Sequence, residues 1–211
     1  KAPLRDTLKH HWREVLIAAG LKVVETAPFY IFSTFVVSYA TTMLTYQKSQ
    51  ALEAVTLGAL VATVMIPLMG LLSDKIGRQR MYAASVFILG LFMVLWFMLL
   101  NTGTTWGIVL ATVIAFGVLW APVTAVLGTL CSEIFSANVR YTGITLGYQL
   151  GAALAGGTAP LIATGLLAKY DGDWIPVAWY LAVTVVISLI AIFCASRVKR
   201  TTLLQAQPEH L

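Results

Sequence analysis

Six long apolar stretches, separated by short gaps, occupy most of this 211-residue chain. An α-helix needs about 20 mainly apolar residues to cross the hydrocarbon core of a bilayer. The chain is 59% hydrophobic and 11% charged, whereas soluble domains carry about 25% charged residues. One water-soluble core could not bury that much apolar surface. The sequence therefore predicts an all-α membrane protein with spans at roughly 15–44, 54–72, 81–100, 106–130, 142–167 and 176–195.

Lysine and arginine are distributed unevenly among the gaps. Alternate gaps, counted together with the two ends, place eleven cations on one side of the predicted bundle and two on the other. Cytoplasmic loops retain an excess of Lys and Arg. The net charge of +5 then reflects orientation, and no nucleic-acid partner is expected. The expected organisation is a cytoplasmic N-terminal arm (1–14), a six-helix transmembrane bundle (15–196) and a cytoplasmic tail (197–211).

Two ionisable residues lie inside the first apolar stretch. Lys22 and Glu25 are three residues apart, so they share one face of a helix, and Glu25 falls near the bilayer midplane. Charges there usually face a bundle interior or an aqueous cavity, and Pro28 removes a backbone hydrogen bond close by. Two interpretations stay open: a substrate or proton site, or an intrahelical ion pair that only shapes packing. Tyr30 and Gln149 are candidates to line the same cavity, or to form hydrogen bonds between helices.

The fifth apolar stretch carries small residues at every fourth position. Gly143, Gly147, Gly151 and Ala155 fall on one stripe of a helix, where another backbone can approach closely. The favoured interpretation is helix packing, and a sliding motion along the stripe is compatible with it. The segment 156–160 contains two glycines and a proline, which predict a bend.

A charged segment of about seven residues joins the second and third stretches. Helices joined so tightly must be antiparallel neighbours. The charges either set orientation and form surface ion pairs, or form a cytoplasmic latch in which a carboxylate lies at the positive end of a neighbouring helix. The gap between the fourth and fifth stretches allows the same two interpretations. The candidate gating residues are Asp74, Lys75, Gly77, Arg78, Arg80, Glu133 and Arg140.

Sequence patterns typical of enzymes are missing. The sequence contains no P-loop and no Rossmann glycine fingerprint, and no grouping of Ser, His and Asp or of Cys and His suggests a nucleophile. His10 and His11 are adjacent and His210 is remote, so no metal-ligand spacing appears. We expect no enzymatic activity, no metal site and no cofactor.

The segment 70–80 resembles the G-x-x-x-D-[RK]-x-G-R-[RK]-[RK] signature of the major facilitator superfamily, with Gln79 where a cation is common. The segment 132–148 looks like the corresponding inner loop of the metabolite:proton symporter branch, and the segment 25–30 is similar to the start of the seventh helix there. In that superfamily the signature follows the second helix of each six-helix half, as it does here. The resemblance implies that these helices form the C-terminal half-bundle of a twelve-helix transporter.

The resemblance also implies a function. Two six-helix halves would rock around a central site in alternating access, with the lipid bilayer and the N-terminal half as partners. The cargo would be a proton and a small polar metabolite, such as an organic acid or a zwitterion. Lys22 would meet a substrate carboxylate, Glu25 would carry the proton, and Asp74 would contact the other half.

The expected location is the bacterial inner membrane, with both termini cytoplasmic. Two alternatives remain open. The chain could be a complete six-helix protein that acts as a homodimeric carrier or channel, or a membrane interaction protein without transport.

Overall fold

The computed structural model describes residues 3–205, which form helices joined by short connections. Two of the helical segments, η1 and η2, are π-helices. The segments in chain order are α1 (Pro3–His10), α2 (Trp12–Tyr30), η1 (Ile31–Phe35), α3 (Val36–Thr42), α4 (Lys48–Ile76), α5 (Arg78–Leu100), α6 (Thr105–Thr112), η2 (Val113–Leu119), α7 (Trp120–Ile134), α8 (Arg140–Ala155), α9 (Thr158–Lys169) and α10 (Ile175–Gln205).

Six helices among the described residues are long and apolar enough to cross a membrane, as predicted. Three of them combine several segments, because α2, η1 and α3 form one span, α6, η2 and α7 another, and α8 with α9 a third. Most spans extend a few residues past the predicted apolar limits, since backbone hydrogen bonding continues into polar residues. The spans are Trp12–Thr42, Lys48–Ile76, Arg78–Leu100, Thr105–Ile134, Arg140–Lys169 and Ile175–Val198.

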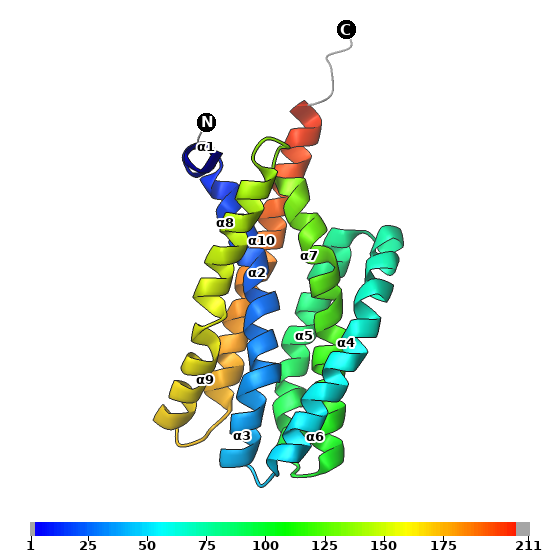
Figure 1. Ribbon diagram of the computed structural model, residues 1–211, viewed down its shortest axis with the longest axis vertical. Coiled ribbons are helices and arrows are strands. Elements are labelled where there is room, and N and C mark those ends of the chain that lie inside the picture. Colours follow the sequence, from blue (N-terminus) through cyan, green and yellow to red (C-terminus); the bar gives the residue numbers. More distant parts are fainter. Residues whose placement is uncertain (1–2, 206–211) are drawn as a thin grey trace.

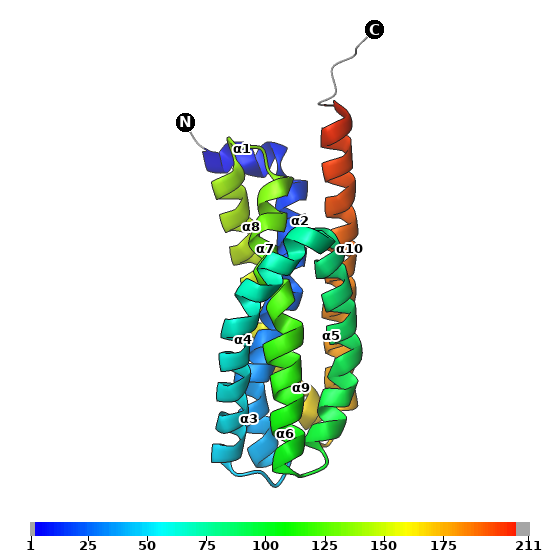
Figure 2. The same ribbon diagram turned by 90° about the vertical axis from the view of Figure 1, so that its right-hand side faces the viewer.

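The spans lie side by side along the long axis of the molecule (Figure 1). The connections α3–α4, α5–α6 and α9–α10 lie at one end, and α1, the α4–α5 corner and the last turns of α10 lie at the other (Figures 1 and 2). Consecutive spans are therefore antiparallel, and the cation-rich segments gather at one end of the bundle.

The corner between α4 and α5 is tighter than the sequence suggested. A turn of about seven residues was expected, but α4 continues to Ile76 and α5 begins at Arg78, which leaves Gly77 as the single connecting residue. Gly77 has φ of 100°, a conformation that a residue without a Cβ adopts at little cost. Because a single residue connects the two helices, both can extend up to the corner.

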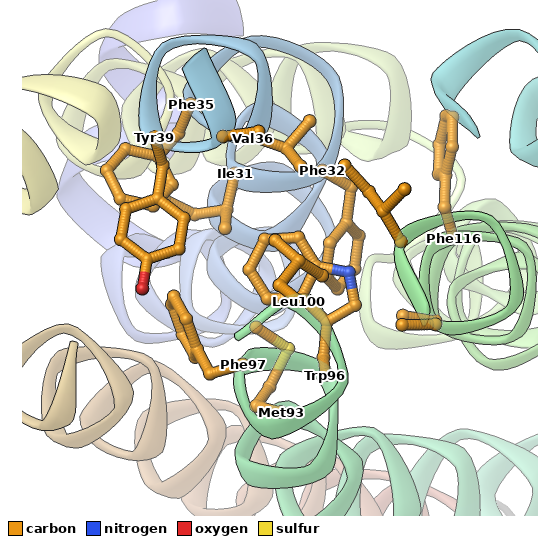
Figure 3. Close-up of a cluster of buried hydrophobic side chains, with 14 of the residues drawn as sticks. Ile31, Phe32, Phe35, Val36, Tyr39, Met93, Trp96, Phe97, Leu100 and Phe116 are labelled. Atoms are coloured by element: carbon orange, nitrogen blue, oxygen red, sulfur yellow. The ribbon is translucent and has the colours of Figure 1, made fainter. Parts of the chain in front are cut away.

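The first span is the central helix of the bundle. In its most apolar window 67% of the residues are buried, against 11% for the second span. Figure 3 shows its C-terminal half, η1 and α3, packed against α5 and η2 in an aromatic cluster. The rings of Phe32 and Trp96 meet edge to face, with centroids 5.4 Å apart, an arrangement that aromatic pairs favour.

The glycine stripe of α8 packs closely against another helix, as the spacing predicted, and that helix is α2. A Cβ at Gly147 would lie 2.6 Å from the Ala18 Cβ, and one at Gly151 would lie 2.7 Å from the Lys22 Cβ. Real side chains essentially never approach so closely, so the two helices depend on glycine here. The predicted bend is also present, because α8 ends at Ala155 and α9 begins at Thr158.

At the cation-poor end of the bundle, a buried tyrosine links the α3–α4 connection to the α5–α6 connection. The Tyr46 hydroxyl donates to the Leu100 carbonyl at 2.7 Å and to the Thr104 carbonyl at 3.0 Å. Burial raises the pKa of Tyr46 above its ordinary value, so the hydroxyl remains a protonated donor throughout the physiological range.

Candidate functional site

Lys22 and Glu25 form an ion pair inside the bundle. Both side chains project from α2, and the Lys22 Nζ lies 2.6 Å from the Glu25 Oε2. The two side chains are only 19% and 13% exposed. Their three-residue spacing on one helical face makes the contact possible, and the glycine stripe of α8 lets a neighbouring backbone approach the Lys22 stem.

The ion pair lines a pocket of about 240 Å³. The pocket is built from α2, α7 and α8, and Tyr30, which is 37% exposed, stands at its rim. The pocket is open on one side, so this volume is only the part that the described residues enclose. Its lining residues are Lys22, Glu25, Thr26, Phe29, Tyr30, Trp120 and Ala152.

Three neighbours complete the surroundings of the ion pair. The Thr26 hydroxyl donates to the Glu25 Oε2 at 3.2 Å. The Trp120 Nε1 donates to the Glu25 backbone carbonyl at 2.7 Å, and the Lys22 Nζ lies 4.7 Å from the centre of the Tyr148 ring, within cation–π range. Sequence reasoning did not single out Trp120 or Tyr148, because they lie in other spans and carry no charge.

The structure brings together three of the four residues expected at the substrate and proton site. Lys22, Glu25 and Tyr30 line the same pocket. Gln149 is exposed on α8 and is not among the residues that line it. The depth of Gln149 in α8 could be predicted from the sequence. The sequence does not show whether Gln149 lies on the face of α8 that meets α2 or on the neighbouring face.

The arrangement of charges supports one kind of chemistry. A proton on Glu25 removes the negative charge that Lys22 pairs with, and leaves the ammonium group available to another anion. A substrate carboxylate and the Glu25 carboxylate can therefore compete for the same cation. Phe29, Tyr30 and Trp120 give the pocket aromatic walls beside the ion pair.

The charged segment after α4 forms a second pocket, at the cation-rich end. Asp74 and Arg78 pair across the corner, with the Asp74 Oδ1 2.7 Å from the Arg78 Nη2. Arg80 and Glu133 join them around a pocket of about 340 Å³, so both inner gaps contribute to one cluster. The pair is solvent-exposed, at 56% for Asp74 and 36% for Arg78.

The remaining gating candidates have different surroundings. Lys75 is exposed and does not line this pocket. The Arg140 Nε donates to the Ser132 carbonyl at 2.9 Å, near the C-terminal end of α7, where a cation is favoured by the helix dipole. Gln79, where the signature commonly has a cation, accepts a hydrogen bond from the Ser196 hydroxyl of α10 at 2.9 Å.

The sequence model of the Major Facilitator Superfamily matches residues 19–210, which include all six spans from the central part of α2 onward. The chain belongs to the major facilitator superfamily. Its members are transporters rather than enzymes, which confirms the expectation that this chain is not an enzyme.

Relatives in the superfamily include bacterial transporters. The chain is 27% identical to the ectoine/proline transporter ProP of Corynebacterium glutamicum, over 90% of this chain and 38% of that protein. It is 28% identical to the shikimate transporter of Escherichia coli, over 89% and 43%, and 24% identical to the citrate-proton symporter of Klebsiella pneumoniae, over 88% and 41%. The chain thus spans about two fifths of the length of these relatives. No solved structure matches it.

Proposed function

We propose that this chain is the C-terminal six-helix half of a proton-coupled symporter for small polar metabolites, such as organic acids or zwitterions. The N-terminal half would cover the pocket that Lys22 and Glu25 line. The substrate would bind between the two halves, and alternating access would expose it to each side of the membrane in turn.

The observation that carries the proposal is the Lys22–Glu25 ion pair in a small pocket inside an apolar bundle. Ionisable residues within membrane spans mark substrate or proton pathways by default. Both side chains remain partly exposed at the pocket, so a ligand or a proton can reach them. A pair with a structural role alone would not require a pocket.

Proton coupling follows from competition for Lys22. With Glu25 ionised, the pair is closed and a substrate anion finds no free cation. With Glu25 protonated, Lys22 binds the substrate carboxylate, so substrate and proton are bound together. The relative named as a citrate-proton symporter supports coupling of this kind, and the names of the other relatives support a small polar substrate.

The orientation and location are part of the same proposal. The cation-rich end faces the cytoplasm, because cytoplasmic loops retain Lys and Arg. Proton-driven uptake needs a membrane that maintains a proton gradient, which in bacteria is the inner membrane. The relatives are bacterial and more than twice as long as this chain, which supports a partner half.

The test is an uptake screen with the complete transporter that contains this chain, expressed in cells that lack related carriers. Radiolabelled ectoine, proline, shikimate and citrate are the probes. We expect gradient-driven accumulation of at least one of them, abolished by a protonophore. Glu25→Gln should abolish accumulation and retain exchange of labelled for unlabelled substrate.

The matched control is Glu53→Gln, which removes an exposed carboxylate from α4 and should leave accumulation unchanged. A folded Glu25→Gln protein that still concentrates substrate with the usual pH dependence would rule out the coupling role of Glu25.

A further inference from the structure

The helical turn that carries Lys22 is hydrogen-bonded to side chains from other spans. The Ser188 hydroxyl of α10 donates to the Gly20 carbonyl at 2.7 Å and accepts from the Val24 N–H at 3.2 Å. In an uninterrupted α-helix these two backbone groups bond to each other. The Ser188 hydroxyl therefore bonds to both ends of this one helical turn.

A second hydroxyl binds the next carbonyl along the chain. The Tyr82 hydroxyl of α5 donates to the Leu21 carbonyl at 2.7 Å, the group that in a regular helix accepts from the Glu25 N–H. Pro28 has no N–H, so the Val24 carbonyl also lacks its usual helical donor. The backbone from Gly20 to Glu25 therefore depends on donors from α5 and α10 as well as on its own ladder.

Both donors are completely buried and lie outside the pocket. Tyr82 and Ser188 have no exposed surface, and neither belongs to the pocket lining. Thr184 offers a useful contrast, because it is a buried hydroxyl one turn earlier in α10 that donates to the Leu181 carbonyl of its own helix. Ser188 instead reaches across to α2, where it contacts the backbone of Gly20 and Val24.

We propose that Ser188 and Tyr82 are positioning residues for the Lys22–Glu25 pair. Their hydrogen bonds to the α2 backbone fix the rotation of this turn, so that two side chains three residues apart meet at 2.6 Å. Loss of either hydroxyl lets the turn relax and weakens the pair. A weaker pair changes the free energy of protonating Glu25.

The proton readout rests on the proposed function, while the positioning itself rests on the contacts described above. The groups that surround Glu25 come from several helices. Lys22 and Thr26 lie on α2 itself. Tyr148 from α8 lies with its ring 4.7 Å from the Lys22 Nζ, Trp120 from α7 donates to the Glu25 carbonyl, and Tyr82 from α5 donates to the Leu21 carbonyl. These groups all remain present in a Ser188 variant, and Tyr82, which interacts with Ser188, is tested by its own variant.

The experiment is pH-difference infrared spectroscopy of the complete transporter in liposomes, with the proton as probe. The carboxyl band that disappears in Glu25→Gln reports protonation of Glu25. In Ser188→Ala we expect its titration midpoint to differ from that of the parent protein. Tyr82→Phe should shift it in the same direction.

Thr184→Val is the control, since it removes a buried hydroxyl of α10 that does not reach α2. Its midpoint should equal that of the parent protein. Unchanged midpoints in both Ser188→Ala and Tyr82→Phe would overturn the proposal, and so would an equal shift in Thr184→Val. If one variant fails to give a monodisperse protein, the other decides.

One outcome would contradict the proposed function without contradicting the positioning proposal. If no carboxyl band of Glu25 appears at any pH, then Glu25 does not carry the coupling proton. Positioning is then judged from the carboxylate stretching frequency of Glu25, which depends on its pairing with Lys22. A frequency that moves in Ser188→Ala but not in Thr184→Val supports positioning, and a frequency that stays unchanged overturns it.

Discussion

Two ion pairs of nearly equal length have different surroundings. The Lys22–Glu25 contact measures 2.6 Å and the Asp74–Arg78 contact 2.7 Å. The first pair is largely shielded from solvent, whereas the second is substantially exposed. An exposed pair contributes about 0–1 kcal/mol to stability, while removal of one partner from a buried pair leaves an uncompensated charge and costs about 3–5 kcal/mol.

Replacement of Lys22 should therefore damage both stability and binding. Lys22→Ala leaves the Glu25 carboxylate in a largely buried pocket without its cation, and we expect a clear fall in the thermal unfolding temperature in detergent. The double variant Lys22→Ala/Glu25→Gln should recover much of the loss. Lys48→Ala, an exposed position, is the control. A single variant as stable as the parent would show that the pair is dispensable.

Binding gives a second measurement on the same variant. Lys22→Ala should weaken citrate binding more than proline binding, if the complete transporter accepts both, because citrate depends more on the missing cation. Equal losses for both probes would argue that Lys22 acts on the fold and not on the substrate.

Asp74→Asn should change gating with little effect on stability. The carboxylate is 56% exposed, so its loss should cost less than about 1 kcal/mol. We expect slower transport at unchanged substrate affinity and a shift toward the inward-open state, measured by accessibility of an introduced cysteine. Normal turnover in this variant would reduce the charged corner to a topology signal.

The helices themselves differ in how far their sequence predicts them. Apolar length predicted all six spans, and four-residue glycine spacing predicted a close helix contact along α8, but not that its partner would be α2. The π-helical segments η1 and η2 were not predicted, because the sequence around Ile31–Phe35 and Val113–Leu119 is as apolar as regular helix. The single-residue corner at Gly77 was also missed, since helix limits depend on backbone geometry and not on hydropathy.

The α2–α8 contact leads to a prediction at this scale. Gly151→Ala places a Cβ 2.7 Å from both the Ala19 carbonyl oxygen and the Lys22 Cβ, so the helices must separate. Such overpacking costs about 1–3 kcal/mol. Gly165→Ala in α9, where nothing lies within 4 Å of the new Cβ, should be neutral or slightly stabilising. Thermal unfolding of both variants in detergent checks the contrast, and similar behaviour would contradict it.

For the molecule as a whole, the sequence located part of the candidate site. Charge inside an apolar stretch identified Lys22 and Glu25, and local spacing added Tyr30. Trp120 and Tyr148 could not be predicted, because their place beside Lys22 and Glu25 depends on how α7 and α8 pack against α2. The same dependence explains why Gln149, a reasonable candidate from its depth in the helix, lies outside the pocket lining.

Orientation in the membrane can be measured directly. In a background with Cys131 and Cys194 replaced by Ala, Thr102→Cys should react with an impermeant thiol reagent in intact cells, because its loop lies at the cation-poor end. Lys75→Cys, exposed at the other end, should react only after the cells are permeabilised. The opposite labelling pattern would invert the proposed topology.

The π-helical segment η1 affects how this protein is compared with others. A π turn bonds residues five apart and so holds one residue more than an α turn. Deletion of one residue within Ile31–Phe35 that restored α spacing would therefore keep α3 on its present face. Tyr39 would still meet Phe97 and Asn101, which it contacts here, although its position in the chain would be one residue earlier. Alignment by position alone with a relative whose helix lacks such a turn would exchange buried and exposed positions throughout α3, so residues beyond Ile31 must be matched through structure.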